Sequence, residues 1–542
     1  MTFKTAAPFD QLSALVFAAL TGVIVFTFQD YGLAWDDPFG EQYGTLIVDY
    51  ILSGGADGRV DDFRNLQNYG GLFDGLAALA SMVSPLEPFH TRHLLVAMTG
   101  ALGALGVWAM ARALGGAAAG FWALAIVLAM PTYTGHMFIN AKDIPFAAAT
   151  IWTLYFAMRA LADFPQVSDK TALGLGLALG ATMGVRIGGA VLVAYLGVLL
   201  AMHFLWRDDR TPSSVRESAR AVAIASGVSF VLTFALWPSA WPFMFDKAVL
   251  ALLDTAKFKF DVDVLFQGAE VNSLDLPLAY VPGYFAVKLP DVILVLVFVA
   301  LPLAMARFVR AYGLGDRLVV FGLSALALGI FFPPLFAMSV HSAHYDALRH
   351  FIFVLPPLAV LLGVETAAAL AWLGTKQRVL GVLAGLAVAA GLVLPVTAMV
   401  QLHPYAYTYY NRLAGGAQGA QGRYELDYWA TSYREAARWL RSARVVPKTG
   451  EVPVYVCGPT DSAARFLPAR FKIVKNVSDA HFFIGFTRWT CDSLVDAPIL
   501  YAVERAGAQF ARVKDLRGGF SLLGELPTNV RIVEDYPRYG QN

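Results

Sequence analysis

Residues 11–38 read QLSALVFAALTGVIVFTFQDYGLAWDDP, an apolar run followed shortly by two adjacent acids. The run Leu12–Phe28 is close to the roughly 20 residues with which a helix crosses a bilayer. It lacks a small-residue cleavage site, so we predict a retained membrane helix rather than a signal peptide. Asp36 and Asp37 then lie at a membrane boundary, where an ionisable residue is a functional candidate by default.

Similar apolar runs recur through residues 1–400. The chain has 542 residues, of which 57% are hydrophobic and only 15% charged, with a mean hydropathy of +0.56. This composition predicts an α-helical polytopic membrane protein. The formal net charge of +1 gives no indication of a nucleic-acid partner. Hydropathy predicts about eleven spans, near 11–29, 92–111, 117–132, 144–162, 171–185, 187–206, 220–238, 290–306, 318–338, 350–372 and 379–400.

The Lys and Arg residues of the short loops predict the orientation, because cytoplasmic loops carry the excess of positive charge. If the N-terminus with Lys4 is cytoplasmic, every predicted inner loop is basic. The residues concerned are Arg112, Arg159, Lys170, Arg207, Arg210, Arg216, Arg220, Arg307, Arg310, Arg317, Lys376 and Arg378. An odd number of spans then places the C-terminal tail outside. We therefore predict a membrane domain over 1–400 and an outer domain over 401–542.

The two long outer loops, 30–91 and 239–289, are predicted to carry amphipathic helices. In the first loop, apolar residues recur at helical spacing over 39–51 and again over 72–83. Such helices either lie on the membrane surface or pack on the protein's own helices. The sequence leaves both alternatives open. We find no inverted repeat of the kind that many transporters carry.

The tail changes in composition. Tyr405, Tyr407, Tyr409 and Tyr410 indicate an aromatic belt at the membrane exit. Beyond it, an amphipathic helix is predicted over Ser432–Leu440. Short β-like runs alternate with helix-like stretches such as Asp461–Phe466, which predicts a small α/β domain. The β-like runs are Val452–Val456, Phe471–Val474, His481–Phe486 and Ile499–Val503.

Both cysteines of the chain, Cys457 and Cys491, lie in this tail. An oxidising outer compartment permits a disulfide between them, and we favour it. Two buried free thiols are the alternative, because spacing in the sequence does not establish proximity.

Three acids at predicted outer ends are candidates for chemistry. Asp37 precedes Pro38 and is explained as the N-cap of the following helix. Asp36 has no such local role and is the better candidate for a general base. Asp143, in the stretch Asn140–Pro145, is either a helix cap or a second functional acid.

Cations accompany these acids on the same side. Lys142 neighbours Asp143, Arg186 lies between two apolar runs, and Arg349 and His350 open the tenth span. A guanidinium suits bidentate binding of phosphate, whereas snorkelling to lipid headgroups is the alternative for Arg349. His341, His344 and His350 lack a clean ligand set, so we predict no metal site and no cofactor.

Separated carboxylates with cations at membrane depth suit a reaction between a lipid phosphate and a polar acceptor. A polyprenyl-phosphate sugar is the corresponding donor, since its phosphate leaves as an anion that cations stabilise. The acceptor hydroxyl needs a carboxylate to take its proton. Attack opposite the phosphate inverts the anomeric centre.

These residues resemble the bacterial members of the glycosyltransferase C superfamily, near family 39 with its protein O-mannosyltransferases and aminoarabinose transferases. The acidic pair in Trp35-Asp36-Asp37 is similar to that superfamily's mark in the first outer loop. Asp143 is similar to its second acid, and Gly184–Gly188 resembles a donor-phosphate stretch. Other similar stretches are Leu348–Phe351, Leu355–Pro357, Tyr409–Asn411, Glu425–Trp429 and Ser432–Ala437.

The resemblance implies a fold of the glycosyltransferase C type and an inverting, lipid-phosphate-dependent glycosyltransferase of the bacterial inner membrane, with its site and tail facing the periplasm. It implies that Asp36 is the catalytic base and that Asp143 assists. The donor is then a polyprenyl-phosphate sugar such as an undecaprenyl one, and the acceptor a glycolipid, polysaccharide or protein. The implied substrate-binding residues are Asp37, Lys142, Arg186, Arg349 and His350.

The chain departs from mannosyltransferase relatives at Asp37, where they carry Glu, which shortens its reach. Oligosaccharyltransferase-like members use a divalent metal, whereas the two branches resembled here do not require one. A transporter or lipid flippase that uses the same charges, and a non-catalytic scaffold, are the competing interpretations.

Overall fold

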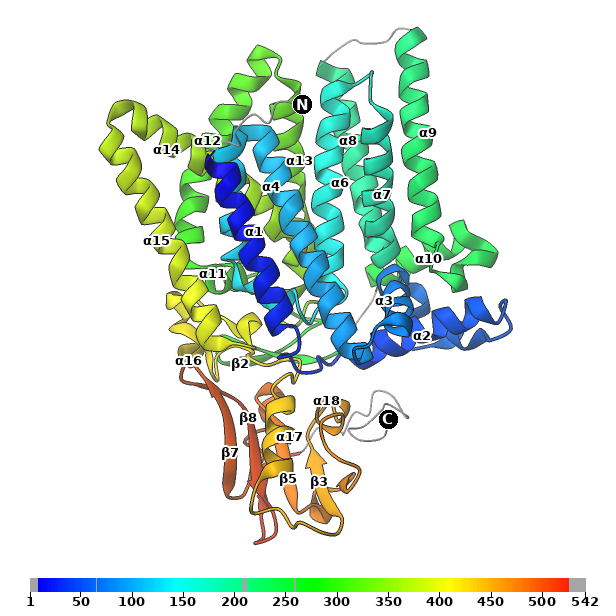
Figure 1. Ribbon diagram of the computed structural model, residues 1–542, viewed down its shortest axis with the longest axis vertical. Helices are drawn as coiled ribbons and strands as arrows, with labels where there is room; N and C mark the ends of the chain where they lie inside the picture. Colours follow the sequence, from blue (N-terminus) through cyan, green and yellow to red (C-terminus); the bar gives the residue numbers. More distant parts are fainter. Residues whose placement is uncertain (1–7, 65, 207–211, 258–259, 526–542) are drawn as a thin grey trace.

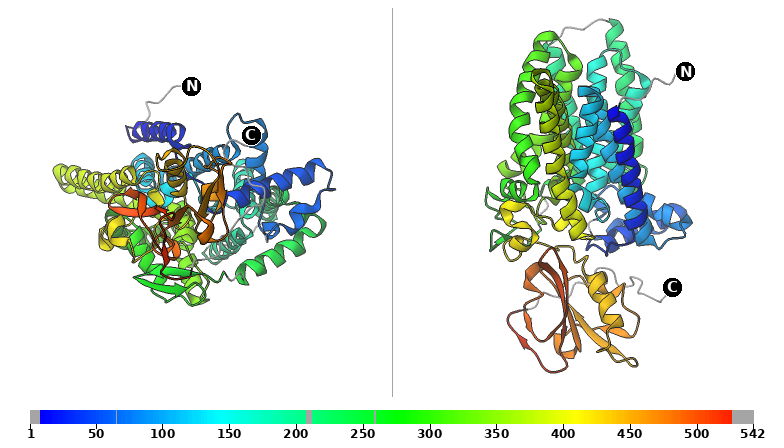
Figure 2. Two further views of the ribbon diagram at one scale, coloured as in Figure 1. Left: turned by 90° about the horizontal axis from the view of Figure 1, so that it is seen from below. Right: turned by 60° about the vertical axis from the view of Figure 1, so that its left-hand side comes forward.

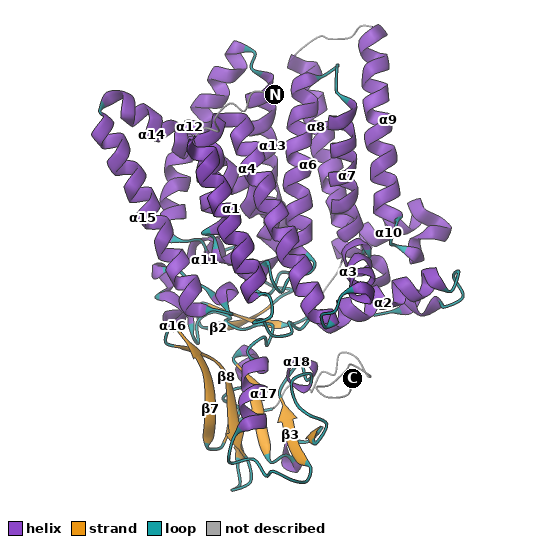
Figure 3. Ribbon diagram, in the orientation of Figure 1, coloured by secondary structure: helices purple, strands orange, loops and turns teal. Residues whose placement is uncertain are grey.

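The computed structural model describes residues 8–64, 66–206, 212–257 and 260–525. It shows a bundle of long helices with a small sheet domain beneath one end (Figures 1 and 3). Lys4, Arg207 and Arg210 of the predicted inner side lie outside the described residues. The short helices of the two long loops and the sheet domain share one end of the bundle, opposite the start of the first helix (Figure 2).

Every predicted span corresponds to a helix. The long helices are α1 (Pro8–Thr27), α4 (Pro88–Leu128), α6 (Asp143–Asp163), α7 (Asp169–Val185), α8 (Val191–Trp206), α9 (Pro212–Phe234), α12 (Asp291–Leu314), α13 (Arg317–Ser339), α14 (Leu355–Lys376) and α15 (Arg378–Leu402). Within the described residues, nine helices are long and apolar enough to cross a membrane. This confirms the predicted helical membrane fold.

Two details reconcile nine helices with eleven predicted spans. The helix α4 contains two of the spans, because its backbone leaves the helical region at Gly116, where φ is +81°. Glycine adopts that region without steric cost, and Gly120 comes back against Trp108 and Arg112. The helix α7 has 17 residues and is just too short to be counted among the nine, whereas α8 reaches sufficient length together with the 3₁₀ turn Ile187–Ala190 before it.

Short elements fill the end of the bundle beside the sheet domain, which the sequence predicts to face outward and which is called the outer end below. They are α2 (Asp37–Leu52), α3 (Leu72–Val83), α5 (Pro131–His136), α10 (Met244–Lys257), α11 (Tyr280–Lys288), α16 (Gly416–Ala420) and the hairpin β1 (Asp263–Phe266) and β2 (Ala269–Asn272). The predicted amphipathic helices are thus present as α2 and α3. The hairpin was not predicted from the sequence.

The helices α2 and α3 combine the two alternatives that the sequence left open. Tyr43 and Ile47 of α2 are fully buried against the rest of the outer loop. Leu79 and Val83 of α3 are exposed, as are several apolar residues of α10. One face of these helices therefore packs on the protein, and the other presents apolar side chains of the kind that enter a membrane interface.

The predicted aromatic belt is wrong. Tyr405, Tyr407, Tyr409 and Tyr410 are all buried within the protein. The chain turns back under the bundle after α15, so these rings pack against α5 and the following loops. Tyr407 donates a hydrogen bond to Asp427, and Tyr410 donates one to the Glu425 carbonyl at 2.6 Å. Amphipathic rings thus satisfy their hydroxyls inside the protein.

The sheet domain has five strands in the order β4-β3-β5-β8-β7. Its elements are α17 (Tyr433–Ser442), β3 (Val452–Val456), α18 (Asp461–Ala464), β4 (Phe471–Ile473), β5 (Phe482–Phe486), β6 (Val495–Asp496), β7 (Ile499–Arg505), β8 (Ala508–Asp515) and β9 (Ser521–Leu522). The first three strands of the sheet are parallel, and β8 and β7 run antiparallel. The predicted small α/β domain is present, with β8 as an additional central strand. Residues 403–432 pack under the bundle rather than in the sheet.

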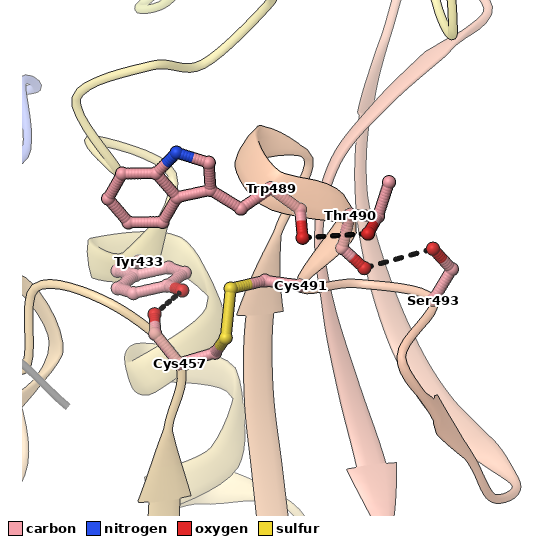
Figure 4. Close-up of a disulfide and its surroundings, with 6 residues drawn as sticks. All are labelled: Tyr433, Cys457, Trp489, Thr490, Cys491 and Ser493. Carbon is pink, nitrogen blue, oxygen red and sulfur yellow. Dashed lines mark hydrogen bonds between the residues drawn. A yellow bond between two sulfur atoms is a disulfide. The ribbon is translucent and has the colours of Figure 1, made fainter. Parts of the chain in front are cut away.

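A disulfide joins Cys457 and Cys491, which confirms the favoured pairing (Figure 4). It connects the end of β3 to the segment after β5, across a sequence separation of 34. The Tyr433 hydroxyl donates to the Cys457 carbonyl at 2.5 Å, which anchors α17 to the same point (Figure 4). The disulfide therefore fixes the edge of the domain nearest the bundle.

Close packing of α4 on α14 organises the bundle. A Cβ added to Gly363 would lie 2.4 Å from the Ala123 backbone nitrogen, so the two helices touch through backbone. Small residues permit such contact between membrane helices. Gly374 on the same helix has open space around it.

We predict that Gly363→Ala destabilises the protein by about 1–3 kcal/mol, because the added methyl group forces two packed helices apart. The measurement is thermal unfolding of detergent-purified protein followed by gel filtration. Gly374→Ala is the matched control and should leave the unfolding temperature unchanged or slightly raised. Equal effects at both positions would contradict the packing argument.

Candidate functional site

Four segments bring the predicted site residues together at the outer end of the bundle. Asp36 lies in the turn before α2, and Asp143 is the first residue of α6. Arg186 follows the last residue of α7. Arg349 begins the short 3₁₀ helix Arg349–Val354 that leads into α14. The residues are far apart in the sequence, and the helix ends collect them at one level.

Arg349 is the centre of this group. Its Nη1 donates to Asp36 Oδ2 at 2.9 Å and lies 3.3 Å from Asp346 Oδ2. Its Nε lies 3.9 Å from Asp143 Oδ2. The Arg349 side chain is 6% exposed, and it stacks over Tyr345 and Trp429. It therefore bridges three acids inside the protein rather than reaching out to lipid headgroups.

Asp143 joins two arginines. Its Oδ1 lies 2.8 Å from Arg186 Nη2, and its Oδ2 accepts from the Asn140 side chain at 2.8 Å. Asn140 Oδ1 also accepts from the backbone amides of Lys142 at 3.2 Å and Asp143 at 2.8 Å, which orders the turn before α6. The alternative that Asp143 is a helix cap is wrong, because its carboxylate faces the cations.

Asp37 has different partners from Asp36. Its Oδ2 accepts from the Ala34 amide at 2.9 Å and lies 3.1 Å from His93 Nε2. Arg92, which also pairs with Asp74, lies 3.8 Å from Asp37 Oδ1. The residue is 2% exposed. Asp37 therefore stabilises the turn that presents Asp36, and it caps the preceding loop rather than α2.

Lys142 and His350 border the group. The Lys142 ammonium lies 5.1 Å from the centre of the Tyr69 ring, and no ion pair is found for it among the described residues. His350 Nε2 is 3.4 Å from Arg349 Nη2, and His350 Nδ1 is 3.4 Å from His344 Nδ1. Within the described part of the chain, no group of three or more His, Cys, Asp or Glu could hold a metal ion.

A small polar cavity of about 10 Å³ opens beside the acids. This is the space that one water molecule needs. Its lining residues are Asp36, Asp37, Arg92, Ile139, Asn140, Ala141, Lys142 and Trp429. The Asp36 side chain is 41% exposed, whereas that of Arg349 is 6% exposed. Asp36 is therefore the more accessible partner of the ion pair.

The charges around Asp36 keep it ionised. Burial raises the pKa of this carboxyl, but the nearby Arg349, Lys142 and Arg186 outweigh it and lower the pKa below its ordinary value. Asp36 is thus an acceptor of protons at neutral pH, in contact with a cation that is also suited to phosphate. A base and an anion-binding group occupy the same site.

Sequence reasoning missed two residues of this cluster. One is Asp346, which lies in the sequence between His344 and Arg349 and accepts hydrogen bonds from Trp429 Nε1 at 3.2 Å and Arg488 Nη1 at 2.6 Å. Arg488 lies in a polar turn of the sheet domain with no recognisable pattern. Only its position between aromatic residues, three residues before Cys491, could have drawn attention to Arg488 in the sequence.

Two further buried charged residues, Glu425 and Lys288, lie near the cluster. Glu425 is 4% exposed and Lys288, at the end of α11, is 2% exposed. Burial raises the pKa of Glu425 and lowers the pKa of Lys288, because each loses the water that stabilises its charged form. Lys288 donates to the Tyr407 carbonyl at 3.1 Å, and this hydrogen bond ties α11 to the segment after α15.

Part of the sequence matches the model of a known protein family. Residues 89–237 match the family model described as dolichyl-phosphate-mannose-protein mannosyltransferase. This stretch includes Asp143 and Arg186. Over this stretch, the match agrees with the resemblance to protein O-mannosyltransferases. None of the curated proteins matches the sequence.

Solved structures give further likenesses. ArnT from Cupriavidus metallidurans bound to undecaprenyl phosphate has 16% identity and a TM-score of 0.47, covering 95% of this chain and 99% of that one. The oligosaccharyltransferase of Archaeoglobus fulgidus has 11% identity and a TM-score of 0.48, covering 78% and 59%. The Pmt1–Pmt2 complex of S. cerevisiae, bound to its sugar donor, has 17% identity and a TM-score of 0.34, covering 49% and 39%.

Alanine substitutions of Asp36 and Asp37 should lower the stability of the protein by different amounts. We predict that Asp37→Ala destabilises the protein by about 3 kcal/mol, because it leaves the buried Arg92, His93 and the Ala34 amide short of a partner. Asp36→Ala should cost less, about 1 kcal/mol, since Asp36 is 41% exposed and the buried Arg349 keeps Asp346 and Asp143 as neighbours. Thermal unfolding in detergent measures both, and the reverse order would contradict the assignment.

Proposed function

We propose that the protein transfers a sugar from a polyprenyl-phosphate donor to a hydroxyl acceptor at the outer face of a bacterial inner membrane. The observation that carries this proposal is the Asp36–Arg349 pair at the membrane boundary, a partly exposed base in contact with a buried cation. The family match supports a lipid-linked glycosyltransferase. The disulfide in the domain beside the site supports an oxidising compartment on this side.

In the proposed reaction, Asp36 takes the proton of the acceptor hydroxyl. The freed oxygen attacks the anomeric carbon of the donor, and the bond from that carbon to the phosphate oxygen breaks. The phosphate leaves with the bonding electrons, so the anomeric centre inverts. Arg186, Arg349 and Lys142 stabilise the developing negative charge, while Asp143 holds the two arginines apart at fixed positions.

An apolar cavity supports the lipid nature of the donor. It measures about 540 Å³, lies among α6, α7, α8 and α9, and has no charged residue in its described lining. Met183, near the end of α7, lines this cavity, and Arg186 directly follows the last residue of the same helix. A polyprenyl chain in this cavity would carry its phosphate to Arg186.

The first test is transfer from a labelled polyprenyl-phosphate sugar pool to a membrane extract. Asp36→Asn should lower transfer by about 100-fold or more, the contribution typical of a general base. Asp143→Asn should lower it too, because the two arginines lose the carboxylate between them. Asp49→Asn, on an exposed ion pair with Arg59, is the matched control. Full transfer by Asp36→Asn would exclude it as the base, and lipid movement without any transfer product would favour a flippase.

A second test concerns the lipid chain. Val222→Trp places a large ring in the apolar cavity, so the KM for a long-chain donor should rise several-fold, while a short-chain donor should be little affected. Val231→Trp is the control, because Val231 is exposed on the same helix but does not line the cavity. Steady-state kinetics with the two donors measure the effect. Equal KM changes with both donors would contradict this use of the cavity.

A further inference from the structure

The sheet domain reaches the candidate base through a row of alternating charges. Asp36 pairs with Arg349 at 2.9 Å. Arg349 Nη1 lies 3.3 Å from Asp346 Oδ2, and Asp346 Oδ1 accepts from Arg488 Nη1 at 2.6 Å. We call Asp36, Arg349, Asp346 and Arg488 the charge row. It begins in the first outer loop and ends in the other domain.

Three members of the charge row are removed from water. The side chains of Arg349, Asp346 and Arg488 are 6%, 3% and 4% exposed. Charges interact more strongly in such surroundings, because the effective dielectric constant is lower than that of water. Removal of the Arg488 charge therefore changes the electrostatic energy of Asp346 and Arg349, because water screens these charges only weakly.

The turn that carries Arg488 is held from both sides. Trp489 and Thr490 have φ of +53° and +52°, a backbone conformation that persists only where the surroundings impose it. Cys491 is fixed to Cys457 by the disulfide (Figure 4). Trp489 packs edge-on against Trp35, the neighbour of Asp36, with ring centres 5.3 Å apart. These contacts give Arg488 a defined position.

The two carboxylate oxygens of Asp346 face two different arginines. Arg488 occupies Oδ1, while Trp429 and Arg349 face Oδ2. Arg488 also donates to the Tyr428 carbonyl at 3.1 Å and lies 3.5 Å from Glu425. Because Arg488 neutralises part of the charge of Asp346, Arg349 remains shared between Asp346 and Asp36.

We propose that Arg488 is a positioning residue for sugar transfer, through which the sheet domain holds Arg349 against the base Asp36. The inference rests on the proposed function and adds to it a residue from another domain. In this role Arg488 touches neither substrate nor the reacting atoms. It acts by way of Asp346 and Arg349.

Loss of Arg488 has a defined electrostatic consequence. Asp346 would keep Arg349 as its remaining close cation and draw it away from Asp36. Asp36 would then lose part of the positive charge that keeps it ionised, so its affinity for a proton would rise. The acidic limb of the rate profile should move to higher pH. The charged and titratable groups near Asp36 are Arg349, Lys142, Arg186, Arg92, Asp37, Asp143, Asp346 and Tyr345.

The experiment compares pH profiles of kcat/KM for full-length, disulfide-intact protein with a labelled polyprenyl-phosphate sugar donor. Arg488→Gln should move the acidic limb upward by roughly one pH unit and lower kcat more than the donor KM. In the double variant Arg488→Gln with Asp346→Asn the limb should return toward wild type, because the competing carboxylate is neutral. Such non-additivity identifies a direct coupling.

Arg505→Gln is the matched control. Arg505 also ties the sheet domain to the bundle, since it donates to the His403 carbonyl at 3.0 Å and to Glu435 at 2.7 Å, yet it is not part of the charge row. Its acidic limb should stay at the wild-type position. An equal shift in Arg505→Gln would overturn the proposal in favour of general domain docking.

Two further outcomes are distinguishable. If Arg488→Gln does not fold, Arg488→Lys keeps a charge but loses the forked geometry, and it should show a smaller shift in the same direction. A wild-type profile in whichever of the two variants folds would overturn the proposal. Absence of transfer by the wild-type protein would instead overturn the proposed function, and this inference with it.

Discussion

The buried guanidinium of Arg349 is the interaction on which the outer end of the protein depends. It faces acids from the first outer loop, from the start of α6 and from its own segment. A single buried charge of this kind is costly unless it is paired and hydrogen-bonded. The segments that provide its partners are therefore required to meet here, although their residues are up to 313 positions apart in the sequence.

The same constraint explains why the segment after α15 lies under the bundle. Trp429 covers the Arg349 guanidinium and donates to Asp346, and its carbonyl accepts from the Trp35 amide at 3.1 Å. The tyrosines of residues 405–410 continue this contact with buried hydroxyls. The sheet domain is consequently joined to the site by packed aromatic rings and ion pairs, and it is part of the environment of the base.

The site also illustrates how one sequence motif can contain two different roles. Asp36 and Asp37 are adjacent, yet helical geometry directs them to different partners, and only one is open to solvent. Asp37 sustains the turn through the Ala34 amide, His93 and Arg92. Asp36 is left facing cations that lower its pKa. Adjacent carboxylates with unlike surroundings have different chemical uses.

The sequence by itself determined the helices, because apolar runs of membrane length need no partner to be recognised, and it singled out Asp36, Asp143, Arg186 and Arg349 because charges beside such runs are rare. It also indicated most strands of the tail by their apolar alternation. Only the tertiary structure decided the burial of the tyrosines, the separate role of Asp37, and the places of Asp346 and Arg488. Those depend on which side chains face each other across different segments, and a contact of this kind leaves no periodic trace along the chain.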